Sequence, residues 1–163
     1  MVPGLTVFDI DGVLADVRHR LHYLHSRPKD WHGFFTAAAH DAPLAQGQEL
    51  VGSVAAAGEP MRYLTGRPEW TRPATRSWLA EHGFPAAPLA MRPNRDRRPA
   101  RLFKRSTLLR WQAAGHRIEV MYDDDPAVVE TVAAAGFTIR LVTWMDPGED
   151  PTQQDPELWQ AQE

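Results

Sequence analysis

The chain has 163 residues, 43% of them hydrophobic, and a formal net charge of −3, which allows one domain with a buried core and gives no bulk-charge sign of a nucleic-acid or membrane binder. It has no cysteine, which excludes disulfides, thiolate catalysis and thiolate zinc sites. Because no apolar run approaches the roughly 20 residues of a membrane span, and the N-terminus shows no signal peptide, we expect a cytoplasmic protein that does not bind membranes.

Strands and helices are expected to alternate along the chain. The first strand is a short apolar run, Leu5–Phe8, bounded by Gly4 and Asp9. Further strands are expected at 62–64, 89–91, 118–122 and 137–142. Helices are expected at 43–57, 71–82, 99–114 and 127–135, where a starting proline or a following glycine marks most boundaries. This order predicts a three-layer, Rossmann-like α/β fold, with a five-stranded, mostly parallel sheet and helices on both faces.

Two stretches fall outside this alternation. Residues 18–41 are rich in His, Trp and Phe, and we expect one or two helices there, forming a small cap insert at about 18–42. Residues 146–163 combine prolines with many acidic residues and glutamines, which predicts an extended, acidic, proline-rich tail. Residues 1–145, with the insert, are expected to form a single domain whose ligands bind beyond the carboxyl ends of the strands.

Two carboxylates, Asp9 and Asp11, directly follow the first strand. Such a pair suits a hard cation with oxygen ligands, namely magnesium. It also allows one carboxylate to act as a nucleophile and the other to carry a proton. Gly12 permits the tight turn by which the chain leaves the strand. Taken alone, the pattern fits an acidic turn after a strand equally well.

The second predicted strand ends in Thr65-Gly66-Arg67. A hydroxyl group and backbone amides at this position can hold phosphate oxygens, and Arg67 can grip them bidentately. The alternative is a capped turn between a strand and a helix. Lys104 lies inside the helix expected at 99–114, where a lysine is usually solvated. Its functional interpretation is to neutralise the negative charge of carboxylates and phosphate.

Three consecutive acids, Asp123, Asp124 and Asp125, follow the fourth predicted strand. They repel one another unless a cation holds them together. Because Pro126 opens the next helix, one acid is a candidate N-cap. We expect Asp125 to be this cap and Asp123 and Asp124 to face the metal.

The four signals occur in the order acid, hydroxyl, lysine, acid, and three of them fall at predicted strand ends. Over roughly residues 5–145 the pattern resembles the haloacid dehalogenase (HAD) superfamily. VFDIDGVLAD looks like its first motif, YLTGR its second, Lys104 its third and MYDDDP its fourth. The resemblance implies a phosphatase, that is, a phosphoric monoester hydrolase that depends on Mg²⁺. Dehalogenases of the superfamily lack the second aspartate, so Asp11 favours phosphoryl transfer.

The resemblance also implies a role for each site residue. Asp9 would be the nucleophile that forms a phospho-aspartate, and Asp11 the general acid and base. Asp9 must then be ionised and Asp11 protonated at the first step, and metal beside Asp9 and burial of Asp11 would separate their pKa values. Thr65 would bind the phosphoryl group and Lys104 would steady it. The implied metal ligands are Asp9, the backbone carbonyl of Asp11, and Asp123 or Asp124.

A closer resemblance is to the phosphatase domain of polynucleotide kinase-phosphatases, which remove 3′-phosphates from nucleic acid ends. It rests on an arginine soon after the first motif, an arginine in TGR, and the paired acids of the fourth motif. A tryptophan in the helix expected at 71–82, the stretch LAMR and a basic segment before the lysine also match. The substrate-binding residues implied are Arg20, Gly66 and Arg67. The family has an acid four residues before the lysine, where this sequence has Ala100. No G-x-x-x-x-G-K-[ST] occurs, so this chain has no kinase half.

Three further features each have two interpretations. A basic segment from Arg92 to Arg105 is either an electrostatic footprint for a polyanion or a solvated surface. Histidines that recur every three residues either bind a metal or pack in a lid. Aromatic residues in the insert either stack a nucleobase or form the apolar face of a helix. The histidines are His19, His22 and His25, and the aromatic residues are Trp31, Phe34 and Phe35.

Together these features predict a Mg²⁺-dependent phosphomonoester hydrolase that acts through a phospho-aspartate, with a polynucleotide 3′-phosphate as substrate. A small cap would leave the site open to a large substrate end. One alternative is a phosphatase of nucleoside monophosphates or another small phosphometabolite. Another is a non-catalytic module that binds phosphate or nucleic acid, against which the intact set of site residues argues. The expected partners are thus phosphorylated substrates, either nucleic acid ends or nucleotides.

Overall fold

Five parallel strands form the central sheet of the computed structural model, which describes residues 2–145. Their order across the sheet is β5-β4-β1-β6-β7. The strands are β1 (Leu5–Phe8), β4 (Met61–Pro68), β5 (Leu89–Arg92), β6 (Ile118–Asp123) and β7 (Ile139–Leu141). The predicted five-stranded parallel sheet is confirmed, and β4 extends four residues beyond the strand expected at 62–64.

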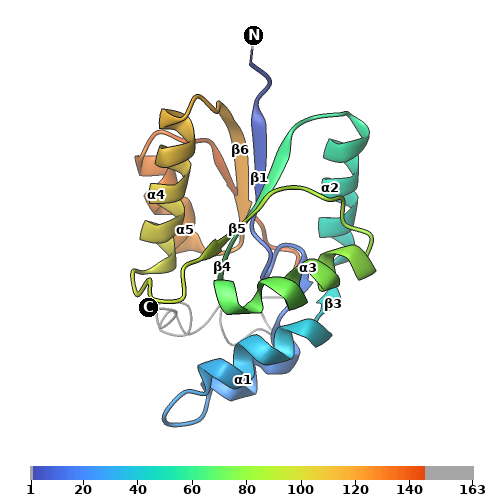
Figure 1. Cartoon of the computed structure of the whole chain (residues 1–163), viewed down its shortest axis with the longest axis vertical. Coiled ribbons are helices and arrows are strands. Elements are labelled where there is room, and N and C mark those ends of the chain that lie inside the picture. Colours follow the sequence, from blue (N-terminus) through green and yellow to red (C-terminus); the bar gives the residue numbers. More distant parts are fainter. Residues whose placement is uncertain (1, 146–163) are drawn as a thin grey trace.

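Helices cover both faces of the sheet, which confirms the predicted three layers (Figure 1). On one face, α2 and α3 pack against β1 through a core that includes Val51, Trp78 and Leu79. On the other face, α4 and α5 contribute Phe103 and Val132 to a second core. All residues of β1 are buried, because it lies between two strands and between two helical layers. The helices are α2 (Ala45–Ala56), α3 (Arg72–Glu81), α4 (Ala100–Ala113) and α5 (Pro126–Ala134).

The helix boundaries agree with the sequence signals except at one start. The helix expected from residue 43 begins instead at Ala45. The reason is that β3 (Ala42–Pro43) pairs antiparallel with β2 (Ala15–Asp16), so Pro43 belongs to a short ribbon. Asp125 caps α5 as predicted, since its carboxylate accepts a hydrogen bond from the Ala127 N–H at 2.8 Å.

The insert between β1 and α2 lies beyond the carboxyl ends of the strands (Figure 1). Its base is the ribbon of β2 and β3, and it contains one α-helix and two 3₁₀ helices: η1 (Arg18–Leu24), α1 (Trp31–Thr36) and η2 (Ala37–His40). A small core of its own includes Leu21, Leu24 and Phe34. The role of this insert as a cap stays a prediction, as does the single domain over 1–145. The predicted tail, 146–163, lies outside the described residues.

None of the helices within residues 2–145 has both the length and the apolar character that crossing a membrane requires.

The start of α2 packs against the loop after β1, which carries the second aspartate. The Leu44 N–H donates a hydrogen bond to the Leu14 carbonyl oxygen at 2.8 Å. At Gly47, a Cβ atom would lie only 2.3 Å from the Val13 carbonyl oxygen. A glycine at this position therefore allows α2 to approach the loop closely.

Two glycines of α2 should respond in opposite ways to alanine. Gly52→Ala has open space around its Cβ and should stabilise the protein by about 0.5–1 kcal/mol, because alanine favours the helix. Gly47→Ala should destabilise it by about 1–3 kcal/mol, because the backbone of the loop must move. Urea denaturation of the two variants measures both effects. Equal stabilisation by both would contradict the close approach of α2 to the loop.

Candidate active site

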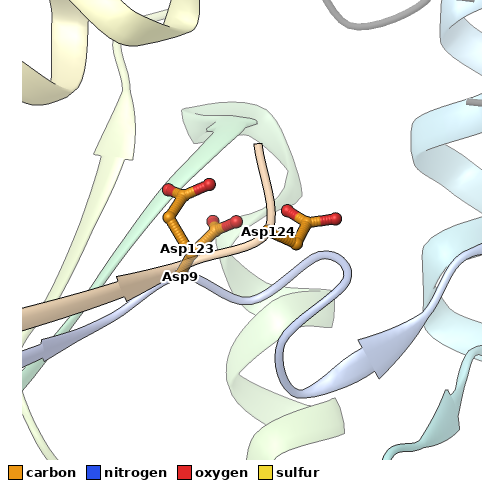
Figure 2. A group of neighbouring side chains, drawn as sticks. All are labelled: Asp9, Asp123 and Asp124. Atoms are coloured by element: carbon orange, nitrogen blue, oxygen red, sulfur yellow. The ribbon is translucent and has the colours of Figure 1, made fainter. Parts of the chain in front are cut away.

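Acidic side chains from two neighbouring strands meet at the carboxyl edge of the sheet. Asp9 follows β1, whereas Asp123 ends β6 and Asp124 comes next. Because β1 and β6 pair in parallel, the Asp9 N–H reaches the Tyr122 carbonyl oxygen at 3.0 Å. One carboxylate oxygen from each of the three aspartates lies within 4.8 Å of the others. Figure 2 shows the three carboxylates gathered at the ends of these strands.

Lys104 reaches this cluster from α4. Its Nζ lies 2.7 Å from Asp123 Oδ2 and 3.1 Å from Asp9 Oδ1. The side chain is only 5% exposed, so Lys104 is not the solvated surface residue that is usual inside a helix. Its orientation does not depend on an acid four residues earlier, because Ala100 lies there and lines the same cavity.

The predicted catalytic and metal-binding residues all line one small cavity. Thr65 enters it from β4, is 1% exposed, and accepts a hydrogen bond from the Arg67 N–H at its Oγ1. Gly66 lines both this cavity and a larger neighbouring pocket. The lining residues of the cavity are Asp9, Asp11, Thr65, Gly66, Ala100, Lys104, Asp123, Asp124 and Asp125.

Arg20 and Arg67 lie behind the cavity and do not line it. Both side chains are buried, and both bind Asp11 at Oδ1: Arg20 through Nη2 at 2.8 Å, and Arg67 through Nη2 at 2.7 Å and Nε at 3.0 Å. The two arginines therefore hold Asp11 in place. Their predicted contact with substrate phosphate stays a prediction.

Asp41, which the sequence did not single out, binds the same two arginines from the other side. It accepts hydrogen bonds from Arg20 Nε at 2.8 Å and Nη2 at 2.9 Å, and from Arg67 Nη2 at 3.1 Å. The Asp41 side chain is completely buried, and its backbone carbonyl accepts a hydrogen bond from Trp78 Nε1. Two buried arginines are thus matched by two buried acids, Asp11 and Asp41, as burial of charge requires.

Two carboxyl groups of the cluster, those of Asp9 and Asp124, have raised pKa values. Burial raises the pKa of Asp9 well above its usual value, and repulsion from Asp123 adds to this, while Lys104 opposes it. Burial and the charges of Asp9 and Asp123 likewise raise the pKa of Asp124. Burial would lower the pKa of Lys104, but Asp123 and Asp9 outweigh it and raise that pKa. The ionised cluster therefore carries more negative charge than one lysine offsets.

Asp11 behaves in the opposite way. Burial alone would raise its pKa, but Arg20 and Arg67 outweigh burial and lower the pKa to about 2. The expectation that burial would give Asp11 a raised proton affinity is therefore not met, because the net effect on its pKa is a decrease. The physical reason is the pair of guanidinium groups at its Oδ1.

The three aspartates of the cluster fit a divalent metal ion. Among the described residues, Asp124 Oδ2 has no hydrogen-bond partner although it is buried. A Cβ at Gly12 would lie 1.8 Å from this oxygen, so a larger residue at position 12 would displace it. Carboxylate oxygens are the donors that hard cations prefer. The side chain of Asp11 is turned toward the arginines and is not in this group, so its contribution through the backbone carbonyl stays a prediction.

The histidine repeat does not form a second metal site among residues 2–145, where the aspartate cluster alone has suitable geometry. His19 Nε2 lies 2.6 Å from Asp41 Oδ1, and His22 Nδ1 contacts the His19 carbonyl oxygen. These contacts support the interpretation of packing within the insert.

Comparison with known proteins agrees with this geometry. A family model for the polynucleotide kinase PNKP phosphatase domain matches residues 3–146, and no curated protein matches the chain. The chain is similar to a protein in the Pnkp1/Rnl/Hen1 RNA repair complex, with a TM-score of 0.74 and 21% identity over 86% of this chain and 42% of that one. It therefore spans less than half of that relative.

Two bacterial enzymes have a similar fold. A class C acid phosphatase from Bacillus anthracis with tungstate bound has a TM-score of 0.62 and 15% identity, covering 95% of this chain and 80% of that chain. A putative beta-phosphoglucomutase from Thermotoga maritima has a TM-score of 0.56 and 15% identity, covering 83% of each chain. At these identities the likeness shows the fold.

Removing Asp41 should destabilise the protein strongly. Asp41→Ala leaves two buried arginines with one acid between them, which should cost about 3–5 kcal/mol. Glu69→Ala is the matched control, because Glu69 forms an ion pair with Arg72 in which both side chains are partly exposed, and should cost less than about 1 kcal/mol. Urea denaturation measures the two variants. A similar small loss in both would show that Asp41 does not balance the arginines.

Proposed function

Because this chain belongs to the family of polynucleotide kinase PNKP phosphatase domains in the HAD superfamily, and is therefore a phosphatase, we propose that it is a Mg²⁺-dependent polynucleotide 3′-phosphatase that works through a phospho-aspartate on Asp9. The observation that carries this proposal is the meeting of Asp9, Lys104 and the Asp123–Asp124 pair in one cavity.

Asp9 is the proposed nucleophile. One of its carboxylate oxygens attacks phosphorus, the bond from phosphorus to the leaving oxygen breaks, and a phosphoryl group stays on Asp9. Lys104 Nζ, 3.1 Å from Asp9 Oδ1, offsets the repulsion between two anionic reactants. The Thr65 hydroxyl and the Gly66 amide bind phosphoryl oxygens. Asp9, the Asp11 carbonyl, and Asp123 or Asp124 would hold Mg²⁺, which would supply further positive charge.

Asp11 is the proposed general acid and base. It gives a proton to the leaving oxygen and then takes one from the water that hydrolyses the phospho-aspartate. Arg20 and Arg67 donate their hydrogen bonds to Oδ1 of Asp11, so we assign the proton to Oδ2. A phosphate dianion that enters beside Asp11 would raise its pKa, because like charges disfavour ionisation. Substrate binding thereby supports protonation of an acid that is otherwise ionised.

Nucleic acid ends are the proposed substrates for two reasons. The matched family is that of a polynucleotide kinase's phosphatase domain, and one structural relative belongs to an RNA repair complex. Assembly with further repair proteins, as in that complex, is part of the same proposal. A cytoplasmic location stays a prediction from the sequence.

Loss of either catalytic carboxylate should remove turnover, for different reasons. Asp9→Asn should reduce phosphate release to background, because no nucleophile remains. Asp11→Asn should lower kcat by roughly 10²–10⁴-fold on a 3′-phosphorylated oligonucleotide. On an aryl phosphate, whose leaving group needs no proton, only the first step should stay fast, so a burst of leaving group should precede slow hydrolysis of the phospho-aspartate. Glu81→Gln, on the exposed end of α3, is the control. Ordinary activity of either aspartate variant would overturn the assigned roles.

Substrate preference tests the rest of the proposal. A phosphate-release assay with Mg²⁺ should compare 3′-phosphorylated oligonucleotides, 5′-phosphorylated oligonucleotides, free nucleotides and sugar phosphates. We expect the highest kcat/KM on the 3′-phosphorylated oligonucleotides, a steep fall in their binding as salt increases, and no release after chelation. Higher kcat/KM on free nucleotides or sugar phosphates, with little dependence on salt, would favour a metabolite phosphatase instead.

A further inference from the structure

A larger pocket opens beside the phosphate cavity. It has a volume of about 280 Å³, and Gly66 lines both spaces. The insert forms one wall through α1, and the segments that follow β4 and β5 form the other. A ligand whose phosphate lies at Asp9 can therefore extend past Gly66 into this pocket. A volume near the lower end of the roughly 300–1,000 Å³ that is usual for ligand sites suits one flat ring system rather than a large cofactor.

Aromatic rings from distant parts of the chain line this pocket. Trp70 is 44% exposed, and its ring stacks on His32 of α1 with centroids 5.0 Å apart and planes 14° apart. Trp31 and Phe35 form a second stacked pair, 5.9 Å between centroids. Phe34 differs from them, since it is 1% exposed and belongs to the core of the insert. Trp31 and Phe35 pack against that core and also line the pocket.

The stacked pair of His32 and Trp70 lies outside the hydrophobic cores. Trp70 belongs to none of the hydrophobic clusters found among residues 2–145, and it is the only aromatic residue among the exposed large hydrophobic side chains there. Exposure of an indole ring costs free energy that burial against a ligand would recover. Trp70 therefore offers a surface for a planar ligand.

Hydrogen bonds fix the wall of the pocket. The backbone N–H of Trp70 donates a hydrogen bond to Asn94 Oδ1 at 2.9 Å. This bond connects the segment after β4 to the segment after β5. Arg92, which is buried, donates from Nε to the Gly66 carbonyl oxygen at 3.2 Å and from Nη1 to the Arg98 carbonyl oxygen at 2.9 Å. These contacts hold the wall in place before a ligand arrives, which lowers the entropic cost of binding.

The pocket also carries positive charge at its rim. Arg97 is exposed and lines the pocket, whereas Arg98 is paired with Asp96 at 2.6 Å. Within residues 2–145, the Arg97 guanidinium group has no ion pair or hydrogen bond to a protein group. Aromatic rings beside such a group suit a ligand that has both a flat apolar ring and a phosphate, and sugar phosphates lack the ring. Stacking on aromatic side chains together with cationic contacts is how proteins hold single-stranded nucleic acid.

We infer that this pocket binds the base of the nucleotide that carries the 3′-phosphate, by stacking against Trp70, while Arg97 contacts a backbone phosphate of the same strand. This inference rests on the proposed function and names the feature of the substrate that the site reads. The stacking surface accepts any base, because every base presents a π face. The 3′-terminal base must be unpaired to enter, so single-stranded ends are preferred over blunt duplex ends.

The test compares two oligonucleotides of equal length, one with a normal 3′-terminal nucleotide and one with an abasic 3′-terminal residue, both 3′-phosphorylated. Trp70→Ala should lower kcat/KM at least about fivefold on the normal strand, as expected for one lost stacking contact, and leave the abasic strand unchanged. Arg97→Ala should lower kcat/KM on both strands and reduce the salt dependence of binding. Leu141→Ala and Arg140→Ala are the controls, because these exposed residues lie on β7 away from the pocket.

Equal losses on the two strands for Trp70→Ala, or no loss on either, would overturn the base-binding assignment even if the enzyme is a 3′-phosphatase. The assignment would also be overturned if the loss of kcat/KM in Trp70→Ala depended on the presence of the penultimate base rather than of the 3′-terminal base. Failure of the base-binding assignment can be told apart from failure of the proposed function by a binding measurement. This measurement follows binding of the unphosphorylated normal strand by fluorescence anisotropy. If no 3′-phosphate is released but binding still weakens with Trp70→Ala and with an abasic terminus, the pocket binds a base and only the proposed reaction fails.

Discussion

Three buried carboxylates within 4.8 Å of one another repel strongly, and the surrounding protein replaces the water that would screen them. Lys104 supplies one positive charge to Asp9 and Asp123, which is too little for the ionised cluster. A divalent cation would supply the rest. In the proposed reaction the same cation and the same lysine allow anionic Asp9 to approach an anionic phosphate. Stability of the cluster and catalysis would then depend on one balance of charge.

The second aspartate of the first motif lies in a separate electrostatic environment. Asp11 binds Arg20 and Arg67, which also bind Asp41, and the two guanidinium groups lower the pKa of its carboxyl group. Arg20 and Asp41 both come from the insert between β1 and α2. The insert thus has a structural role at the site. The same segment supplies the aromatic wall of the neighbouring pocket.

Sequence order predicted the parallel sheet and the residues that meet in the cavity, because the carboxyl ends of adjacent parallel strands share one edge. The network around Asp41 was not predictable from the sequence. Asp41 binds Arg20 and Arg67 directly, but the fold of the insert brings them together, and no regular spacing in the sequence relates the three residues. Pro43 was predicted to start a helix, because proline is common at that position. It lies instead in β3, which pairs with β2. The place of Trp70 beside the pocket was not predictable from the sequence either, because its stacking partner, His32, lies on a different element of the chain.

We propose that Asp9 and at least one of Asp123 and Asp124 would hold one divalent ion. A crystal structure with Mn²⁺ in place of Mg²⁺, recorded at the manganese absorption edge, tests it most directly. We predict one anomalous peak about 2 Å from an oxygen of Asp9 and from an oxygen of Asp123 or Asp124. A metal-loaded crystal with no peak between these carboxylates, or with its only peak elsewhere on the protein, would contradict the account.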